Sequence, residues 1–189
     1  KKDQEDMTMM LGKTYGINPT ALRFFGTYGT RQALSNPYTG VCAIFSTALL
    51  SGNPPLVYED GQQTRDLIYV QDIIQALILS MQKSEASGKI YNVGTGSAIS
   101  ILKVAKLLQQ KIDPAIDINI THEFRVGDVR HITADISKIH HDLGFTPQFT
   151  FEEGIDELVR WTRKQHKKAK IEDKSQEAKK ELFDKGLLK

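Results

Sequence analysis

Three polar stretches of this 189-residue chain carry side chains that could bind a phosphorylated ligand. Arg65 follows a polar turn and precedes a short apolar run, and Asn92 follows another apolar run at residues 90–91. Arg125 and Asp128 stand in the third stretch, FRVGDVRH. A planar guanidinium can take two phosphate oxygens at once, and a diphosphate requires more than one cation. Arginines on separate loops at strand ends therefore indicate a diphosphate site.

A more ordinary role stays open for each arginine taken by itself. Arg65 could pair at the surface with Asp66 or Asp60, which is the commoner arrangement for a single arginine. A glycine turn at Gly94 and Gly96 follows a predicted strand, but a third glycine and a suitably spaced acidic residue are absent. This turn is therefore not interpreted as a dinucleotide-binding fingerprint.

The composition excludes several other kinds of function. A net charge of +2 gives no overall field for nucleic acid or an anionic membrane, and no apolar stretch approaches the ~20 residues of a membrane span. Cys42 lies in the apolar run VCAIF, which indicates a buried, inert thiol. His140 and His141 fall on a predicted exposed helix, and no metal-ligand spacing is present in the sequence.

The segments that must position these side chains alternate between strand and helix. The predicted helices cover residues 1–16, 41–50, 73–82, 101–111 and 151–161, and the predicted strands cover 20–25, 67–70, 89–93 and 116–120. Asp72 stands where a helix N-cap belongs. Between the first strand and the second helix lies a long polar loop that contains Tyr28 and Asn36, and a loop of this length is usually functional. The alternation predicts an α/β fold.

The chain changes character after Trp161. A basic run that includes Lys164, Lys167 and Lys168 is followed by alternating acidic residues and lysines. Such a pattern predicts a solvated helix with a frayed end. Nucleic-acid binding by this run has less support, because no aromatic residues interleave with the lysines and no nucleic-acid-binding motif is present.

Six segments, taken in order and spacing, resemble the extended short-chain dehydrogenase/reductase family: RFFGTYGTRQ, SNPYTGV, EDGQQTRDLIYVQD, YNVGTG, RVGDVRHITADISK and LGFTP. More narrowly, residues 1–161 are similar to NAD-dependent nucleotide-sugar epimerases and dehydratases. The resemblance implies the carboxy-terminal part of a doubly wound, Rossmann-like domain plus a small mixed α/β substrate-binding lobe. Residues 1–40, with parts of 66–95, would belong to the first, 41–161 mainly to the lobe, and 162–189 to a charged helical tail.

The resemblance also implies roles for single residues. Lys1, four residues before Glu5, matches the lysine of the family's Tyr-x-x-x-Lys pair. That lysine holds the nicotinamide ribose and favours the phenolate of its tyrosine partner, which would precede residue 1. Phe25 and Tyr28 would contact the cofactor, NAD. The implied substrate contacts are Asn36, Gly40, Val41, Leu56, Tyr58, Arg65, Asn92, Arg125 and Asp128.

One segment departs from the family's pattern. The family usually has Asn-Val-Tyr-Gly-Pro where this chain has Gly26-Thr27-Tyr28-Gly29-Thr30. Without the asparagine side chain, one hydrogen bond to the substrate is absent at Gly26. The identity of the sugar therefore stays open.

The activity that the resemblance implies is epimerisation at C4 of a UDP- or dTDP-linked hexose through a 4-keto sugar, with bound NAD regenerated in each cycle. A nucleotide-sugar 4,6-dehydratase and a UDP-glucuronate decarboxylase share the oxidation step and stay as alternatives. A non-catalytic, ligand-sensing or RNA-associated relative of the same fold is the alternative of another class. We expect a cytoplasmic homodimer of the full-length protein. The present chain, as a carboxy-terminal portion without the glycine-rich loop and the tyrosine, is expected to be inactive alone.

Overall fold

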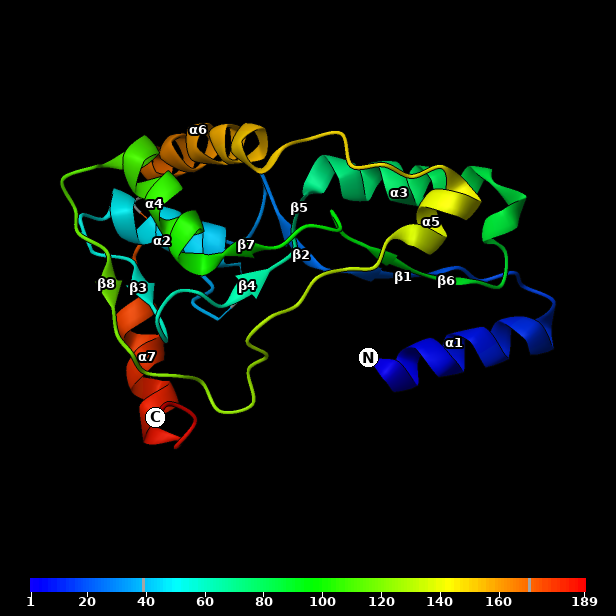
Figure 1. The fold of residues 1–189 in the computed structure, drawn as a ribbon, viewed down its shortest axis with the longest axis horizontal. Coiled ribbons are helices and arrows are strands. Elements are labelled where there is room, and N and C mark those ends of the chain that lie inside the picture. The colour runs from blue at the N-terminus through cyan, green and yellow to red at the C-terminus, as the bar shows by residue number, and fades with distance from the viewer. Residues whose placement is uncertain (39, 170) are drawn as a thin grey trace.

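The computed structural model describes residues 1–38, 40–169 and 171–189, and strands and helices alternate along it (Figure 1). The helices are α1 (Lys2–Tyr15), α2 (Val41–Leu50), α3 (Val70–Gln82), α4 (Ile101–Ile112), α5 (Ser137–Leu143), α6 (Phe151–Ala169) and α7 (Ser175–Asp184), with a 3-10 turn, η1 (Ser84–Ala86). The strands are β1 (Ala21–Phe24), β2 (Gly26–Tyr28), β3 (Leu56–Val57), β4 (Thr64–Arg65), β5 (Leu67–Tyr69), β6 (Ile90–Val93), β7 (Ile99–Ser100) and β8 (Asn119–Ile120). The predicted α/β class is confirmed. None of the helices in the described ranges has the length and apolar character that crossing a bilayer requires.

The pairing of the strands changes at Phe25. β1 pairs in parallel with β6, whereas β2 pairs in parallel with β5. The backbone NH of Phe25 donates to the carbonyl of Val93 (3.0 Å), and the next NH, that of Gly26, donates to the carbonyl of Asp66 (2.9 Å). A Cβ at position 26 would lie 2.7 Å from that carbonyl oxygen, so the close approach of the two strands requires glycine.

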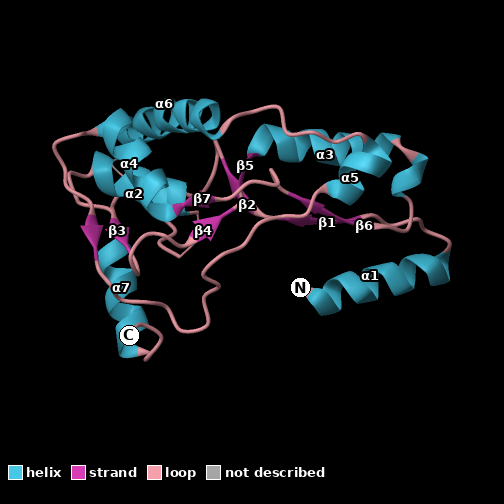
Figure 2. Ribbon diagram, in the orientation of Figure 1, coloured by secondary structure: helices cyan, strands magenta, loops and turns pink. Residues whose placement is uncertain are grey.

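Two hydrophobic cores fill the molecule. The first lies among α2, α4 and α6 and includes the buried side chains of Phe45, Leu108 and Leu158. The second packs α3 and α5 against the β1–β6 pair and includes Tyr91 and Phe145. Figure 2 shows the two groups side by side along the long axis of the molecule. The second core thus takes in α5, which the predicted division of the chain assigned to the lobe at 41–161.

Strand β5 contributes to both cores. Leu67 and Tyr69 pack in the first core, and Ile68, between them, packs in the second. Successive side chains of a strand point to opposite faces, so this short strand is buried on both sides. The two cores are joined through β5 rather than by a flexible linker.

Most helices begin or end at the glycine or capping residues that the sequence predicts for them. Gly16 adopts a left-handed conformation (φ 69°) and closes α1, and the side-chain oxygen of Ser100 caps α4. The predicted N-cap at Asp72 is wrong. Asp72 lies inside the first turn of α3, where its buried carboxylate accepts hydrogen bonds from the backbone NH groups of Gln148 (2.8 Å) and Phe149 (3.4 Å). It fastens the chain between α5 and α6 to α3.

The basic run at Lys164, Lys167 and Lys168 lies exposed on α6, as its charge pattern predicted, but the segment after it is docked and not frayed. α7 packs on the body of the protein, with Ala178 only 4% exposed. Beyond α7, Leu188 is buried, and Phe124 and Lys189 exchange two backbone hydrogen bonds (2.8 and 3.0 Å). A few well-placed apolar side chains therefore dock a segment that is polar in most of its length.

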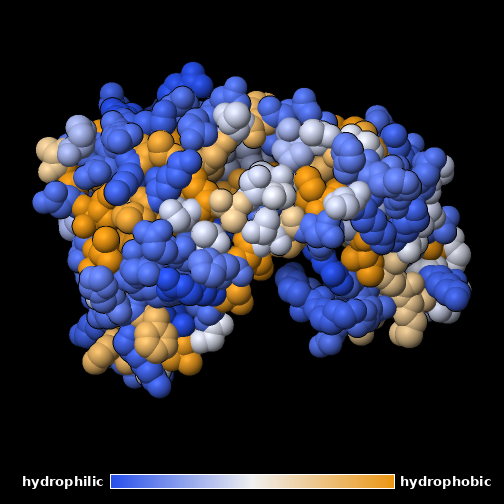
Figure 3. All heavy atoms as spheres, viewed as in Figure 1, coloured by the Kyte–Doolittle hydropathy of each residue, from blue (hydrophilic) through white to orange (hydrophobic). Residues whose placement is uncertain are grey.

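Helix α1 is tied to β1 by an arginine–carboxylate pair. Arg23 Nε and Nη2 donate to the two carboxylate oxygens of Glu5 (2.6 and 2.7 Å), and this contact lowers the pKa of Glu5 to about 2. The opposite side of α1 exposes Met7, Met10 and Leu11. Figure 3 shows a recess in the surface between α1 and the carboxy-terminal part of the molecule.

Candidate functional site

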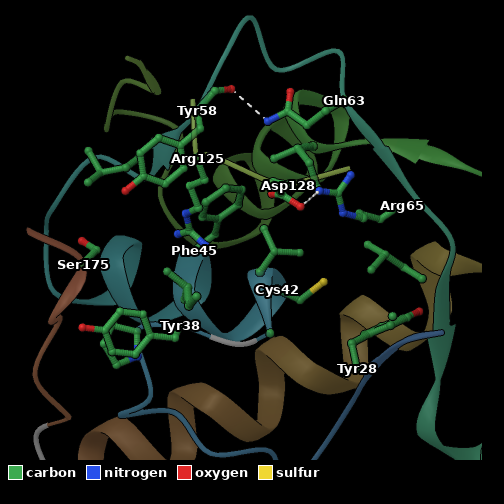
Figure 4. A pocket seen from close by; sticks show the side chains of 18 of the residues that line it. Tyr28, Tyr38, Cys42, Phe45, Tyr58, Gln63, Arg65, Arg125, Asp128 and Ser175 are labelled. Carbon is green, nitrogen blue, oxygen red and sulfur yellow. Dashed lines mark hydrogen bonds and ion pairs between the residues drawn. The ribbon is translucent and has the colours of Figure 1, made fainter. Parts of the chain in front are cut away.

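A cavity of about 390 Å³ lies beside β4, among α2, α7 and the loop that follows β8. Its walls combine apolar and aromatic side chains, such as Phe45 and Tyr58, with the charged groups of Arg65, Arg125 and Asp128 (Figure 4). An apolar cavity into which a few polar groups converge is the usual form of a small-molecule site. The three charged residues come from two of the loops that the sequence singled out.

Arg65 is held in position by three hydrogen bonds. Its Nη2 donates to Asp128 Oδ1 at 2.9 Å, and its Nη1 donates to the carbonyl oxygens of Thr64 (2.9 Å) and Arg130 (3.1 Å). A guanidinium has five N–H donors, so Nε and the second hydrogen of Nη2 stay available to a ligand. A cation fixed in this way loses little conformational freedom on binding a phosphate.

The ordinary pairing proposed for Arg65 is wrong, because neither nearby aspartate is its partner. Asp66 is 1% exposed and accepts hydrogen bonds from the backbone NH groups of Thr95 (2.8 Å), Gly96 (3.0 Å) and Ala134 (3.1 Å). Its carboxylate therefore fixes the loops that follow β6 and precede α5. The partner of Arg65 instead lies 63 residues away in the chain.

Asp60 pairs with Arg130, the other arginine of the third polar stretch. Arg130 Nη2 donates to Asp60 at 2.7 Å, and Arg130 Nη1 also pairs with Glu59. The hydrogen bond from Arg130 lowers the pKa of Asp60, and the same bond raises the pKa of Arg130. Arg130 does not line the cavity. It ties the turn before β4 to the loop that carries Arg125.

Arg125 and Tyr58 form one wall of the cavity. The guanidinium carbon of Arg125 lies 4.7 Å from the ring centroid of Tyr58, a cation–π contact. The Nε of Arg125 is buried and has no hydrogen-bond partner among the described residues. Gln63, 6% exposed, donates to the carbonyl of Tyr58 (2.9 Å) and leaves its own Oε1 without a partner in the described part of the chain. Flat faces with unused polar atoms suit an aromatic, polar ligand such as a nucleobase.

The cavity brings together most of the residues that the sequence assigned to ligand binding. Those that line it are Tyr28, Gly40, Val41, Leu56, Tyr58, Arg65, Arg125 and Asp128. Tyr28 borders the cavity, its ring packs against those of Tyr69 and Phe151, and its hydroxyl donates to the carbonyl of Phe151 (3.2 Å). Burial raises the pKa of Tyr28, so its hydroxyl stays protonated.

Four of the assigned residues lie outside this cavity. Lys1 is exposed at the start of α1, and Phe25 is half-buried where the strand pairing changes. Asn36 accepts a hydrogen bond from the NH of Tyr38 (2.9 Å) and lines a small neighbouring hollow. Asn92 donates to the carbonyl of Asp135 (3.3 Å), so its amide binds the loop before α5. A direct substrate contact from Asn36 or Asn92 stays a prediction.

Sequence reasoning missed several residues of the cavity. Gln63 stands two positions before Arg65, and its place in the same polar turn could have indicated it. Ser175 and Ala178 come from α7, and their local sequence carries no signal of a site. Their position depends on contacts between segments that are far apart in the chain.

The remaining candidates for chemistry are structural. Cys42 is 1% exposed, and burial raises the pKa of its thiol, as expected of an inert cysteine. His140 and His141 are both exposed. Across residues 1–38, 40–169 and 171–189, no group of His, Cys, Asp and Glu side chains forms a cation site.

Comparison with known proteins places these features in a family. A family model described as GDP-mannose 4,6 dehydratase matches residues 1–158. The dTDP-L-rhamnose 4-epimerase of Burkholderia thailandensis is 35% identical over 140 residues, which are 74% of this chain and 38% of that protein. Enzymes named dTDP-glucose 4,6-dehydratase and UDP-glucuronic acid decarboxylase 1 are also among the relatives.

Two solved structures share the fold. The UDP-glucose 4-epimerase of Thermotoga maritima, solved with UDP-glucose, has a TM-score of 0.79 and 32% identity and covers 87% of this chain and 52% of its own. The UDP-glucose 4-epimerase of Thermus thermophilus, in complex with NAD, has a TM-score of 0.72 and 28% identity and covers 84% and 51%. The Rossmann-like fold implied by the sequence is confirmed. The chain spans about half the length of these proteins or less.

Proposed function

This chain belongs to the family described as GDP-mannose 4,6 dehydratase, and from that premise we propose that the full-length protein epimerises C4 of a UDP- or dTDP-linked hexose with the help of NAD. The observation that carries this proposal is the meeting of Arg65 and Arg125, from different loops, in one cavity with Asp128 and Tyr58. Two cations, a carboxylate and an aromatic wall match the diphosphate, ribose and base of a nucleotide sugar.

We assign each part of the ligand a place in the cavity. Arg65, with its free Nε and Nη2 hydrogens, binds the diphosphate. Tyr58 and Arg125 pack on the nucleoside, and the second carboxylate oxygen of Asp128 accepts a hydroxyl hydrogen bond from it. The hexose then extends toward Tyr28 and Gly26 of β2, which also line the cavity.

We place NAD at the carboxyl end of the parallel strands β1 and β6. In open α/β sheets, ligands bind outside the carboxyl ends of the strands. Phe25 follows β1 at that end, and the first turns of α1 are tied to β1 through Glu5 and Arg23. When bound, NAD supplies the acceptor and donor of the hydride at the sugar C4.

Lys1 would act on a proton rather than on the hydride. A cation beside a phenol favours the phenolate, so Lys1 would lower the pKa of a tyrosine that precedes it in the full-length protein. That tyrosine would take the proton of the sugar 4-hydroxyl and return it to the same oxygen, once the 4-keto sugar has turned so that the other face of C4 receives the hydride.

The test is to incubate the full-length protein with UDP-glucose, UDP-galactose and dTDP-hexoses and to follow the products by NMR. Conversion between C4 epimers, with NAD bound in stoichiometric amount, supports the proposal. A 4-keto-6-deoxy sugar as product would assign the 4,6-dehydratase activity instead, and loss of CO₂ from UDP-glucuronate would assign the decarboxylase. Absence of conversion together with absence of bound NAD would leave a non-catalytic relative as the conclusion.

We also propose that the full-length protein is a cytoplasmic protein and that it forms a homodimer through α1. Met7, Met10 and Leu11 are 58%, 62% and 41% exposed and form an apolar face without a partner in the described residues. Exposed apolar faces of this kind mark interaction sites. Light scattering of the full-length protein should give the mass of a dimer, and Met10→Glu should shift it to that of a monomer. A monomeric wild type would contradict the assignment.

A further inference from the structure

Helix α7 forms a wall of the candidate site, although it lies beyond the range 1–158 that the family model matches. Ser175 and Ala178, one turn apart on this helix, both line the cavity. In Figures 1 and 2, α7 stands below the α2–α4 group and next to the short strands β3 and β8. A segment outside the matched family range therefore takes part in the site.

Contacts with the loop after β8 hold one side of this segment. Arg125 and Leu188 form an antiparallel bridge, and Leu188 is 3% exposed. Lys179 pairs with Glu123 at 2.8 Å. Since Arg125 itself lines the cavity, the segment also fixes the backbone that presents this arginine.

Contacts with the loop before α2 and with the end of α2 hold the other side. The hydroxyl of Tyr38 donates to the carboxylate of Glu181. Asp173 accepts hydrogen bonds from Asn53 Nδ2 (3.0 Å) and from the backbone NH of Ser175 (2.9 Å). The first residue of α7 is therefore fixed from both directions, and its side chain has a defined position.

The hydroxyl of Ser175 is buried without a partner. Ser175 is 7% exposed, and its Oγ makes no hydrogen bond in the part of the chain that the structure describes. Leaving a buried hydroxyl unpaired is unfavourable, so native proteins rarely do it without a reason. Because Ser175 borders the cavity, a ligand bound there can supply the missing partner.

The position of Ser175 relative to the charged residues indicates which part of a ligand it meets. In Figure 4, Ser175 lies on the same side of the cavity as Tyr58, whereas Arg65 and Tyr28 lie on the opposite side. The phosphate-binding group is Arg65, and the sugar extends toward Tyr28. The end near Tyr58 and Ser175 is thus the nucleoside end.

We infer that Ser175 hydrogen-bonds the nucleoside of the substrate through its Oγ, so that α7 is a part of the nucleotide-recognition site. The inference rests on the proposed function, since it takes a nucleotide sugar as the ligand. Ala178, the small residue one turn further along α7, leaves room for the base beside Ser175. The hydroxyl can donate to a carbonyl oxygen or accept from a hydroxyl or NH group, and pyrimidine nucleosides offer both kinds of partner.

The experiment measures binding of UDP, dTDP, GDP and the matching hexose nucleotides to the full-length protein by calorimetry. For the nucleotide that the wild type binds best, Ser175→Ala should raise Kd about 3- to 10-fold, the usual effect of one lost hydrogen bond. The factor should be the same with and without the sugar. The melting temperature should stay unchanged, because the Oγ has no partner among the described residues that the substitution could remove.

Ser80→Ala is the matched control, since Ser80 is half-buried on α3 and its hydroxyl donates to the carbonyl of Leu77 (2.8 Å), away from the cavity. This variant should bind as the wild type does. Wild-type affinity of Ser175→Ala would overturn the inference and leave a water molecule as the partner of the hydroxyl. A loss seen only with the sugar nucleotide would overturn the placement at the nucleoside end. The proposed function itself would be overturned if the wild type bound none of the nucleotides and the Arg65→Ala variant behaved in the same way.

Discussion

Arg65 and Asp66 are adjacent in the chain, yet their side chains serve different parts of the molecule. Arg65 faces the cavity and bonds Asp128, whereas Asp66 is buried and gathers NH groups from the loops after β6 and before α5. The alternation of side chains along an extended segment separates the two roles. One residue is available to a ligand, and its neighbour fixes the loops around it.

Replacing Asp66 should destabilise the protein. Asp66→Ala removes the acceptor of three backbone NH groups, of which that of Ala134 is buried, so we expect the free energy of unfolding to fall by about 1–3 kcal/mol. Urea denaturation measures this change. Asp60→Ala is the control, because Asp60 is half-exposed and should change the stability little. Equal stabilities of the two variants would contradict the structural role of Asp66.

Replacing Arg65 should affect the substrate and not the cofactor. Arg65→Ala removes the fork that we assign to the diphosphate, so Kd for the nucleotide sugar should rise about 10- to 100-fold while NAD occupancy stays the same. The matched control is Arg130→Ala, since Arg130 pairs with Glu59 and Asp60 and does not line the cavity. Calorimetry should show at most about a threefold change for it. A similar loss in both variants would point to a disturbed loop instead of a lost phosphate contact.

A side chain at position 26 should strain the close pairing of β2 with β5. A Cβ there would lie 2.7 Å from both the carbonyl oxygen of Asp66 and Leu67 Cδ2. Overpacking of this kind costs about 1–3 kcal/mol, so Gly26→Ala should lower the unfolding free energy by that amount. Thr27→Ala, on the same strand, serves as the comparison in thermal unfolding. A fully stable Gly26→Ala variant would show that β2 and β5 can separate without cost.

Docking of α1 should depend on pH through Glu5. The hydrogen bond from Arg23 lowers the pKa of Glu5 from 4.5 to about 2 in the folded protein. The stabilisation of α1 docking by the ionised Glu5 is therefore complete above about pH 4.5 and is lost as the pH falls toward 2. Hydrogen exchange of α1 amides should be faster in Glu5→Gln than in the wild type at neutral pH. The difference should vanish near pH 2, and a difference that persists there would assign the protection to another contact.

Much of the fold follows from local signals in the sequence. Gly16 and Ser100 mark helix ends by their own backbone and side-chain preferences, and α2 runs over the residues predicted for it. Asp72 is of a residue type that often caps helices, but here its carboxylate accepts hydrogen bonds from backbone NH groups 76 and 77 residues away. Local patterns cannot reveal an acceptor whose donors come from a distant segment.

The residues of the candidate site likewise fall into those that the sequence indicated and those that it did not. The motif order indicated Arg65, Arg125 and Asp128, which line one cavity. The resemblance singled out Arg125 and not Arg130 from this short loop, and the physical reason appears only in the structure, where Arg130 pairs with Glu59 and Asp60. Ser175 was hidden because a charged, polar segment predicts exposure, while its docking depends on the buried Ala178 and Leu188.

The sharing of β5 between the two cores has a consequence for how the molecule unfolds. Leu67 and Tyr69 belong to one core and Ile68 to the other, so neither core can lose this strand without opening its neighbour. We therefore expect the part that holds the cavity and the part that holds the β1–β6 pair to unfold as a single cooperative unit.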